Sequence, residues 1–146
     1  MKFEISIDPN CKETKVIIVT DKVTDEINEM MKRLAETALD TIAVFSERGV
    51  EIVDTHDIIR IFSEQKKVYA QTALGVYSVR LRLYELEDKL DSQFFVRISN
   101  SEIVNIKMIT NMDISFTGTI GVSLRGGIKT YTSRRYVSKI KKLFGI

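Results

Sequence analysis

Residues 95–105 read Phe-Val-Arg-Ile-Ser-Asn-Ser-Glu-Ile-Val-Asn, two apolar runs around a polar centre. Alternation of apolar and polar side chains predicts a strand at residues 94–98 and another at 103–106. Asn100 falls in the connection between them, and on composition alone it is a turn residue. These two strands indicate a chain in which sheet dominates over helix.

The alternation with period two extends in both directions from this segment. Turn residues such as Glu47-Arg48-Gly49 and Arg125-Gly126-Gly127 separate the apolar runs. Further short strands are therefore expected at residues 41–45, 50–53, 57–62, 67–72, 76–80, 109–116, 119–124 and 128–132. Leu83, Leu86 and Leu90 fit one short amphipathic helix, and a final helix begins near Ser133. The predicted class is mainly β, α+β overall, built from antiparallel strands with short helices.

The first 40 residues have a different pattern, which predicts a small strand-strand-helix extension. Strands are expected at residues 3–7 and 15–20, and Thr24 is placed to cap a helix. The apolar stripe of this helix is Ile27, Met30, Met31, Leu34 and Ala38. Helical spacing gives way to alternation near residues 39–41, so we expect an extension at 1–40 and a domain at 41–146. The extension could close the domain core, pair two subunits or dock a regulatory partner.

Several classes of protein are disfavoured by what the sequence lacks. His56 and Cys11 are the only residues of their types, too few for an ordinary His/Cys zinc site. His56 lies in a turn, which favours an exposed or locally hydrogen-bonded imidazole over a catalytic one, and Gly126-Gly127 lacks the spacing of a phosphate-binding loop. No apolar run reaches membrane-spanning length, and the first residues show no secretory pattern. We therefore expect a cytoplasmic protein that is not an enzyme, with no metal, cofactor or small-molecule substrate.

Charge is distributed unevenly along the chain. Residues 1–60 carry 8 basic and 13 acidic side chains (net −5), whereas residues 61–146 carry 14 and 7 (net +7). The last 33 residues contain seven basic side chains and no Asp or Glu. A one-signed surface of this kind indicates a phosphate-rich polymer as partner, although a solvated basic face is the alternative.

Three short segments hold the side chains best suited to nucleic acid. Arg134-Arg135 stands at the entry of the last helix, where a guanidinium fork can bridge a guanine edge or a phosphate. The amide of Asn100 offers the donor and acceptor that match adenine. Lys66-Lys67 occupies another strand connection and could contact phosphates or a groove edge.

The run from Phe95 to Asn105, followed by a polar hairpin and Tyr131-Thr132-Ser133-Arg134-Arg135-Tyr136-Val137, resembles the LytTR DNA-binding domain of bacterial transcription regulators. The resemblance runs from about Val53 to Ile146. It implies a β-rich DNA binder that inserts loops, and no recognition helix, into successive major grooves. The family's contact positions fall on Lys66 or Lys67, Asn100 and Arg135. The first is often histidine in relatives, as is the position of Ser99, so the preferred base sequence stays open.

The resulting hypothesis is a stand-alone transcription regulator that binds double-stranded DNA, with two subunits on repeated half-sites. The roughly 50 residues ahead of the resemblance are too few for a receiver domain, and a membrane protein is a possible regulator. The expected base-contacting residues are Asn100, Arg135 and Lys67, and the expected phosphate-contacting residues are Lys66, Arg97, Lys107, Arg134 and Lys139. Tyrosines among basic residues leave an RNA-binding module as the alternative. A basic adaptor at a membrane or protein surface is the third candidate.

Overall fold

The computed structural model describes residues 1–35, 38–115 and 117–146, and the chain divides into two compact units, Met1–Glu36 and Thr37–Ile146. The strands of the second unit are β1 (Thr41–Ser46), β2 (Gly49–Asp54), β3 (Ile58–Glu64), β4 (Lys67–Thr72), β5 (Gly75–Val79), β6 (Phe95–Ser99), β7 (Glu102–Asn105), β8 (Ile109–Asp113), β9 (Gly121–Leu124) and β10 (Ile128–Tyr131). Its helices are α2 (Leu83–Lys89), α3 (Val137–Phe144) and the short 3-10 helices η1 (Thr55–Asp57), η2 (Ile106–Met108) and η3 (Arg134–Tyr136).

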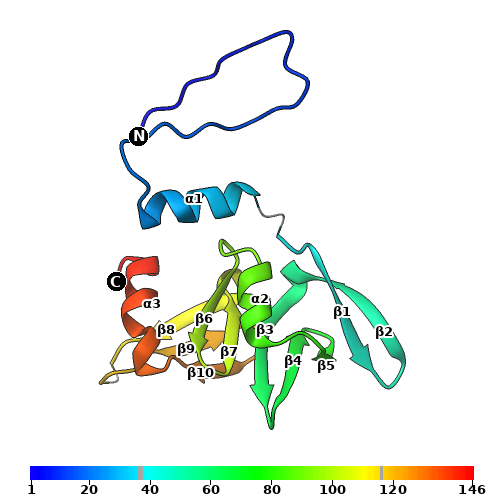
Figure 1. Cartoon of the computed structure of the whole chain (residues 1–146). Coiled ribbons are helices and arrows are strands. Elements are labelled where there is room, and N and C mark those ends of the chain that lie inside the picture. The colour runs from blue at the N-terminus through cyan, green and yellow to red at the C-terminus, as the bar shows by residue number, and fades with distance from the viewer. Residues whose placement is uncertain (36–37, 116) are drawn as a thin grey trace. The chain divides into compact units, whose positions relative to one another are not determined.

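These strands form two antiparallel sheets (Figure 1). The larger has seven strands in the order β2-β1-β5-β4-β3-β7-β6, and the smaller has three in the order β10-β9-β8. Neighbours along the chain mostly pair with each other through tight turns, as expected for antiparallel sheets. The mainly β class with short helices predicted from the sequence is thus confirmed.

Strands β3, β6 and β7 are covered on both faces, which makes them the centre of the unit. On one face Ile61, Phe95 and Ile103 belong to a core shared with β1, β4, β5 and the leucines of α2. On the other face Val96 and Val104 belong to a second core. All four residues of β7 are buried as a result.

A β-bulge in β3 lets consecutive residues of this strand pack into different cores. The pairing of β3 with β4 shifts register between Ile58 and Arg60. As a consequence, Ile58 and Ile61 both belong to the core that includes the leucines of α2, although they are three positions apart. Ile59 belongs to the second core. An extra residue in one strand rotates the residues beyond it, which explains the break in strict alternation.

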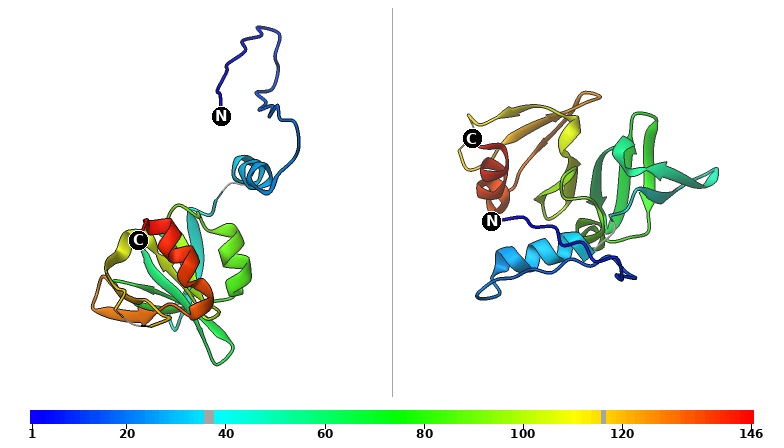
Figure 2. Two further views of the ribbon diagram at one scale, coloured as in Figure 1. Left: turned by 90° about the vertical axis from the view of Figure 1, so that its left-hand side faces the viewer. Right: turned by 90° about the horizontal axis from the view of Figure 1, so that it is seen from above.

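The second core lies between the large sheet, the small sheet and α3. Three of its residues are almost fully buried: Ile120, directly before β9, Val122 in β9, and Ile140 in α3. In the view from above, the small sheet (yellow to orange) and strands β1 to β5 (cyan to green) lie on opposite sides of the unit (Figure 2). Leu143 in α3 remains half exposed.

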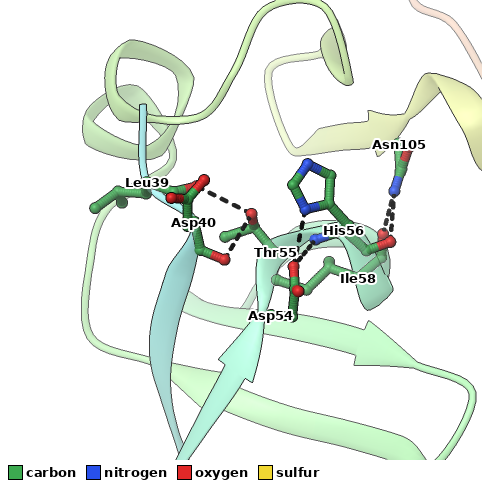
Figure 3. Close-up of polar contacts among 7 residues, drawn as sticks. All are labelled: Leu39, Asp40, Asp54, Thr55, His56, Ile58 and Asn105. Atoms are coloured by element: carbon green, nitrogen blue, oxygen red, sulfur yellow. Dashed lines mark hydrogen bonds and ion pairs between the residues drawn. The ribbon is translucent and has the colours of Figure 1, made fainter. Parts of the chain in front are cut away.

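Buried polar groups fix the chain where it enters the sheet (Figure 3). The Thr55 hydroxyl donates to the carbonyl oxygens of Leu39 and Asp40, at 2.9 and 3.1 Å. The amide of the buried Asn105 donates to the carbonyl oxygens of Ile58 and His56, at 2.9 and 3.3 Å. Each bond satisfies a carbonyl outside the strand ladders, which a buried backbone requires.

The first unit differs from expectation in its strands. Residues 3–7 and 15–20 were predicted to be strands, and this was wrong for the chain as it stands: the described residues before Thr24 run as extended chain without strand pairing (Figure 1). Alternation makes a segment fit for a sheet, but the sheet itself needs a hydrogen-bonded neighbour, and an isolated two-stranded hairpin is marginal in water.

The helix of the first unit was expected and is present as α1 (Asp25–Ala35). The Thr24 hydroxyl accepts from the backbone N–H of Ile27 at 3.3 Å, so Thr24 caps it as predicted. The helix does not reach Ala38, and the part of the prediction on residues 36–37 lies outside the described residues, as does Phe116 at the predicted end of β8.

Replacing Thr55 with Val should lower the free energy of unfolding by about 1–3 kcal/mol, because the Leu39 carbonyl oxygen loses its hydroxyl partner and the Asp40 carbonyl oxygen keeps only the Thr55 N–H, while the shape of the side chain is kept. Urea denaturation followed by circular dichroism measures the change. Thr55→Ser is the matched control, since it retains the hydroxyl. A Ser variant as unstable as the Val variant would show that packing, and not hydrogen bonding, is the role of this residue.

Candidate nucleic-acid interface

The turn between β3 and β4 is a tight two-residue turn that projects from the end of the large sheet. Its residues Gln65 and Lys66 both have positive φ, at 50° and 68°, and Glu64 pairs with Lys67 across it. Two successive left-handed residues define a type I′ turn, in which glycine is usually preferred. Here two long polar side chains occupy these positions, both exposed. Such strain is often kept where a side chain is needed at the tip.

A second tight turn, Asn100 and Ser101, connects β6 to β7, and hydrogen bonds from Arg97 stabilise it. The Arg97 guanidinium donates to the carbonyl oxygens of Ser99 and Asn100, both at 2.7 Å. It also donates to the Glu87 carboxylate on α2 at 2.6 Å. Only 12% of the Arg97 side chain is exposed, so it is engaged in bracing this turn rather than displayed to a partner.

The third segment is η3, which lies beside the β6–β7 turn. The backbone N–H of Ser133 donates to the carbonyl oxygen of Ile98 at 2.9 Å, fixing the entry of η3 against β6. The Tyr136 hydroxyl donates to the side-chain oxygen of Asn100 at 3.4 Å. The Arg135 guanidinium carbon is 5.8 Å from the centre of the Tyr136 ring. Tyr136 therefore links the two predicted base-reading residues.

The three segments lie at one end of the large sheet, which we call the contact end. The N–H of Ser63, at the end of β3, donates to the carbonyl oxygen of Ser101 at 2.8 Å. This bond joins the β3–β4 turn to the β6–β7 turn, as the Ser133 bond joins the β6–β7 turn to η3. In Figure 1 the β3–β4 hairpin points downward at this end. Backbone hydrogen bonds therefore tie together the neighbouring chain segments that carry the exposed residues Lys66, Asn100 and Arg135.

Most of the predicted site residues lie at or beside the contact end. Lys67 is exposed at the start of β4, and Lys139 is exposed in the first turn of α3. Arg134 is exposed, and its side chain lies over Gly118: a Cβ on that glycine would be 3.1 Å from the guanidinium Nε. These residues surround the three turns with positive charge.

Lys107 is the exception to this convergence. It lies in η2, directly beyond Asn105, at the end of β7 that is opposite to Ser101. Four strand residues at about 3.3 Å each separate the two ends. Lys107 is exposed, but it does not belong with the other predicted contacts.

Sequence reasoning missed the residues that support the contact end. The buried Glu102 carboxylate accepts from Arg60 Nη1 at 3.1 Å and from the Thr130 hydroxyl. Arg60 also donates to the Gln71 side chain at 2.8 Å and lies over the Phe62 ring. The available signal was a carboxylate at the start of a short, otherwise mostly apolar strand, since a buried charge needs partners.

The one histidine lies away from the contact end, at the start of β3. His56 Nδ1 is 2.9 Å from the Asp54 carboxylate, and its ring meets Phe94 edge to face. The backbone N–H of His56, followed by its ring, donates to Asp54 and lowers the pKa of that carboxyl from its ordinary value. The predicted locally hydrogen-bonded imidazole is confirmed. Among the described residues, no three His, Cys, Asp or Glu side chains are grouped to hold a metal ion.

Comparison with known proteins defines the class. Exposed arginine, lysine and amide side chains on adjoining turns are of the kinds that hold phosphates and read bases, as in nucleic-acid-binding domains. The family model described as the LytTr DNA-binding domain matches residues 48–145. The chain belongs to this family of DNA-binding domains.

Relatives and a solved structure agree with the assignment. An uncharacterized HTH-type transcriptional regulator of Staphylococcus aureus strain NCTC 8325 is 32% identical over 147 aligned positions, which span 100% of this chain and 99% of the relative. A second such regulator, from strain MRSA252, is 31% identical over the same coverage. The LytTr domain of a protein described as a methyl-accepting/DNA response regulator from Bacillus cereus is 23% identical, with a TM-score of 0.72 over 75% of this chain and 100% of that one, and shares the fold.

The names of these relatives mention a helix-turn-helix, which the described part of this chain does not contain. Helices α2 and α3 are separated by strands β6 to β10. The segments at the contact end are two tight turns and the short helix η3.

None of the described helices is both long and apolar enough to cross a lipid bilayer.

The strained turn leads to a prediction. Lys66→Gly should raise the free energy of unfolding by about 0.5–1 kcal/mol, because relief of the left-handed conformation exceeds the extra unfolded-state entropy of glycine. Chemical denaturation measures the change. The neighbouring Lys67→Gly is the control: it lies in a strand and should lower stability by roughly 0.5–1 kcal/mol. A loss of stability in both variants would mean that the turn stores no strain.

Proposed function

We propose that this protein is a bacterial transcription regulator that binds specific double-stranded DNA with its contact end. The β3–β4 turn, the β6–β7 turn and η3 enter successive major grooves on one side of the duplex. Arg135, Asn100 and Lys67 read base edges, since guanidinium, amide and ammonium groups match donor and acceptor patterns in that groove. Lys66, Arg134 and Lys139 hold phosphates.

The observation that carries this proposal is the link from Asn100 through Tyr136 to Arg135. Base reading needs side chains held within a narrow range of positions, and preorganised contacts lose less conformational entropy on binding. Tyr136 places an aromatic ring between the two candidate readers, and Arg97 fixes the backbone of the β6–β7 turn. Both features support recognition of bases in addition to phosphate attraction.

Two residues of the sequence hypothesis receive different roles. Arg97 is a bracing residue, because its guanidinium donates to the carbonyl oxygens of Ser99 and Asn100 and to the Glu87 carboxylate. Lys107 lies at the opposite end of β7 and is left out of the interface. The proposed phosphate contacts are therefore fewer than the sequence alone indicated.

The RNA-binding alternative finds less support in the tyrosines that suggested it. Tyr69 stacks on Phe62 with ring centres 5.5 Å apart, and the Tyr136 hydroxyl is bound to Asn100. Competition between duplex and single strands at fixed salt distinguishes the two functions. Preferential binding of single-stranded RNA would reverse this order.

The proposal also covers the cellular location, the oligomeric state and a regulatory partner of the protein. A promoter-binding protein works where the chromosome is, so we place the protein in the cytoplasm. It binds as a homodimer on repeated half-sites, which gives each half-site a matching contact end and raises affinity through effective concentration. A membrane protein could regulate it through the acidic first unit, whose charge differs in sign from that of the contact end.

Arg135→Ala should weaken binding to a preferred duplex by about 1–3 kcal/mol, roughly 5- to 150-fold, with a much smaller loss on random DNA. The reason is that a base contact contributes only where the right base is present. Preferred duplexes come from selection out of a random pool, and affinities from titration at several salt concentrations.

Lys107→Ala is the matched control because it removes one exposed positive charge at the opposite end of β7. It should leave both affinities nearly unchanged. Equal losses on preferred and random DNA for Arg135→Ala, or a large loss for Lys107→Ala, would contradict the proposed interface.

A further inference from the structure

The first 23 residues expose an unusual number of large apolar side chains. Phe3, Ile5 and Ile7 are 87, 92 and 88% exposed, and they alternate with polar residues along one extended segment. Other exposed apolar side chains of this unit are Val16, Ile17, Val19, Val23, Met31 and Leu34. A soluble chain rarely leaves such a set uncovered unless another surface binds it.

The segment does not cover itself by folding into a hairpin. A turn is present, closed by the bond from the Cys11 N–H to the Asp8 carbonyl oxygen at 3.0 Å. Pairing across this turn would place Ile7 opposite Lys12 and Ile5 opposite Thr14. Of the apolar residues in the first arm, only Phe3 would face an apolar residue, Val16, and the two arms stay unpaired in Figure 1.

We propose that residues 2–8 pair with the same residues of a second copy, antiparallel about a two-fold axis at Ile5. In this register Ile5 faces Ile5, and Phe3 faces Ile7 of the second copy. On the other face of the strand pair, Lys2 faces Asp8 and Glu4 faces Ser6, so unlike charges meet and like charges do not. The sequence is thus complementary to itself in apolar residues and in charge.

The second arm has the same property. With Val16 opposite Val19 of the second copy, Ile17 faces Ile18, and Glu13 faces Lys22. Each copy therefore brings two strand-forming arms and the amphipathic helix α1, so two copies supply two strand pairs, one for each arm, and two helices that can cover them.

The apolar area is sufficient for a dimer. Nine apolar side chains of this unit beyond Met1 are more than half exposed. At about 60–120 Å² each, they can bury on the order of 500–1,100 Å² per copy, against roughly 800 Å² per partner in a stable interface. The first unit is then the dimerisation element, an inference that rests on the proposed homodimer and names its surface.

Sedimentation equilibrium of the full chain without DNA tests the pairing. The wild-type protein should have twice the monomer mass of 16.7 kDa. Ile5→Lys opposes two like charges on the axis and should raise the dimer dissociation constant by at least about a hundredfold. Ser6→Lys is the matched control: its new charge faces Glu4 of the second copy, and the dimer should persist. A monomeric wild-type chain, or an Ile5→Lys variant as dimeric as wild type, overturns the inference.

Cross-linking gives a second readout that does not depend on folding energetics. In a Cys11→Ser background, Ile5→Cys should form a disulfide-linked dimer on mild oxidation because this position meets itself across the axis. Ser6→Cys, which faces Glu4, should not cross-link. Efficient cross-linking at position 6 and none at position 5 would contradict the register.

DNA titration separates this inference from the proposed DNA-binding function. Ile5→Lys should bind a single half-site as wild type does and lose affinity only on two half-sites, whereas Arg135→Ala loses affinity on both. If the chain binds a single half-site normally but never dimerises, the proposed dimer surface is wrong and the proposed DNA-binding function is retained. Loss of single-site binding by Ile5→Lys would refute the assignment of the first unit to dimerisation alone.

Discussion

The buried carboxylate of Glu102 is the interaction on which the rest of the DNA-binding unit depends. It lies in β7, all of whose residues are buried, and it accepts from Arg60 in the large sheet and Thr130 in the small one. A buried carboxylate without partners is costly, so both donors must be in place when the sheets come together. The charge thereby fixes the position of β10, and with it the start of η3, relative to β3 and β7. An apolar residue in its place could pack but would not specify that alignment.

The sequence predicted the second unit well because its signals are local. Alternating side chains, glycine turns and the leucine-spaced helix each depend on a few neighbouring residues. The candidate base-reading residues Asn100 and Arg135 were chosen from residue type and from the family resemblance, and both lie in contact with Tyr136 in the structure. Lys107 looked equivalent in sequence because charge alone does not reveal at which end of a strand a residue will emerge. Arg97 looked like a phosphate ligand, but its partners are carbonyl oxygens of the β6–β7 turn and a carboxylate of α2, which only the folded chain brings within reach.

The first unit shows the opposite case. Residues 3–7 alternate regularly between apolar and polar side chains, yet the described arms form no ladder, because a strand needs a hydrogen-bonded neighbour. A pattern read along a single chain cannot state whether the neighbour belongs to the same molecule. The prediction of strands at residues 3–7 and 15–20 was wrong for the isolated chain, although the sequence of each segment is complementary to itself in an antiparallel pair.

The placement of side chains on turn tips has an evolutionary consequence. Gln65, Lys66, Asn100 and Arg135 all project outward from backbone whose geometry is set by other residues, so replacing one of them leaves the cores untouched. With the proposed base contacts at these positions, such a scaffold would let DNA preference change one position at a time, without a compensating change in the interior. Proteins that share this sheet should therefore differ most at these four exposed positions and least at the buried residues that pair within the sheet.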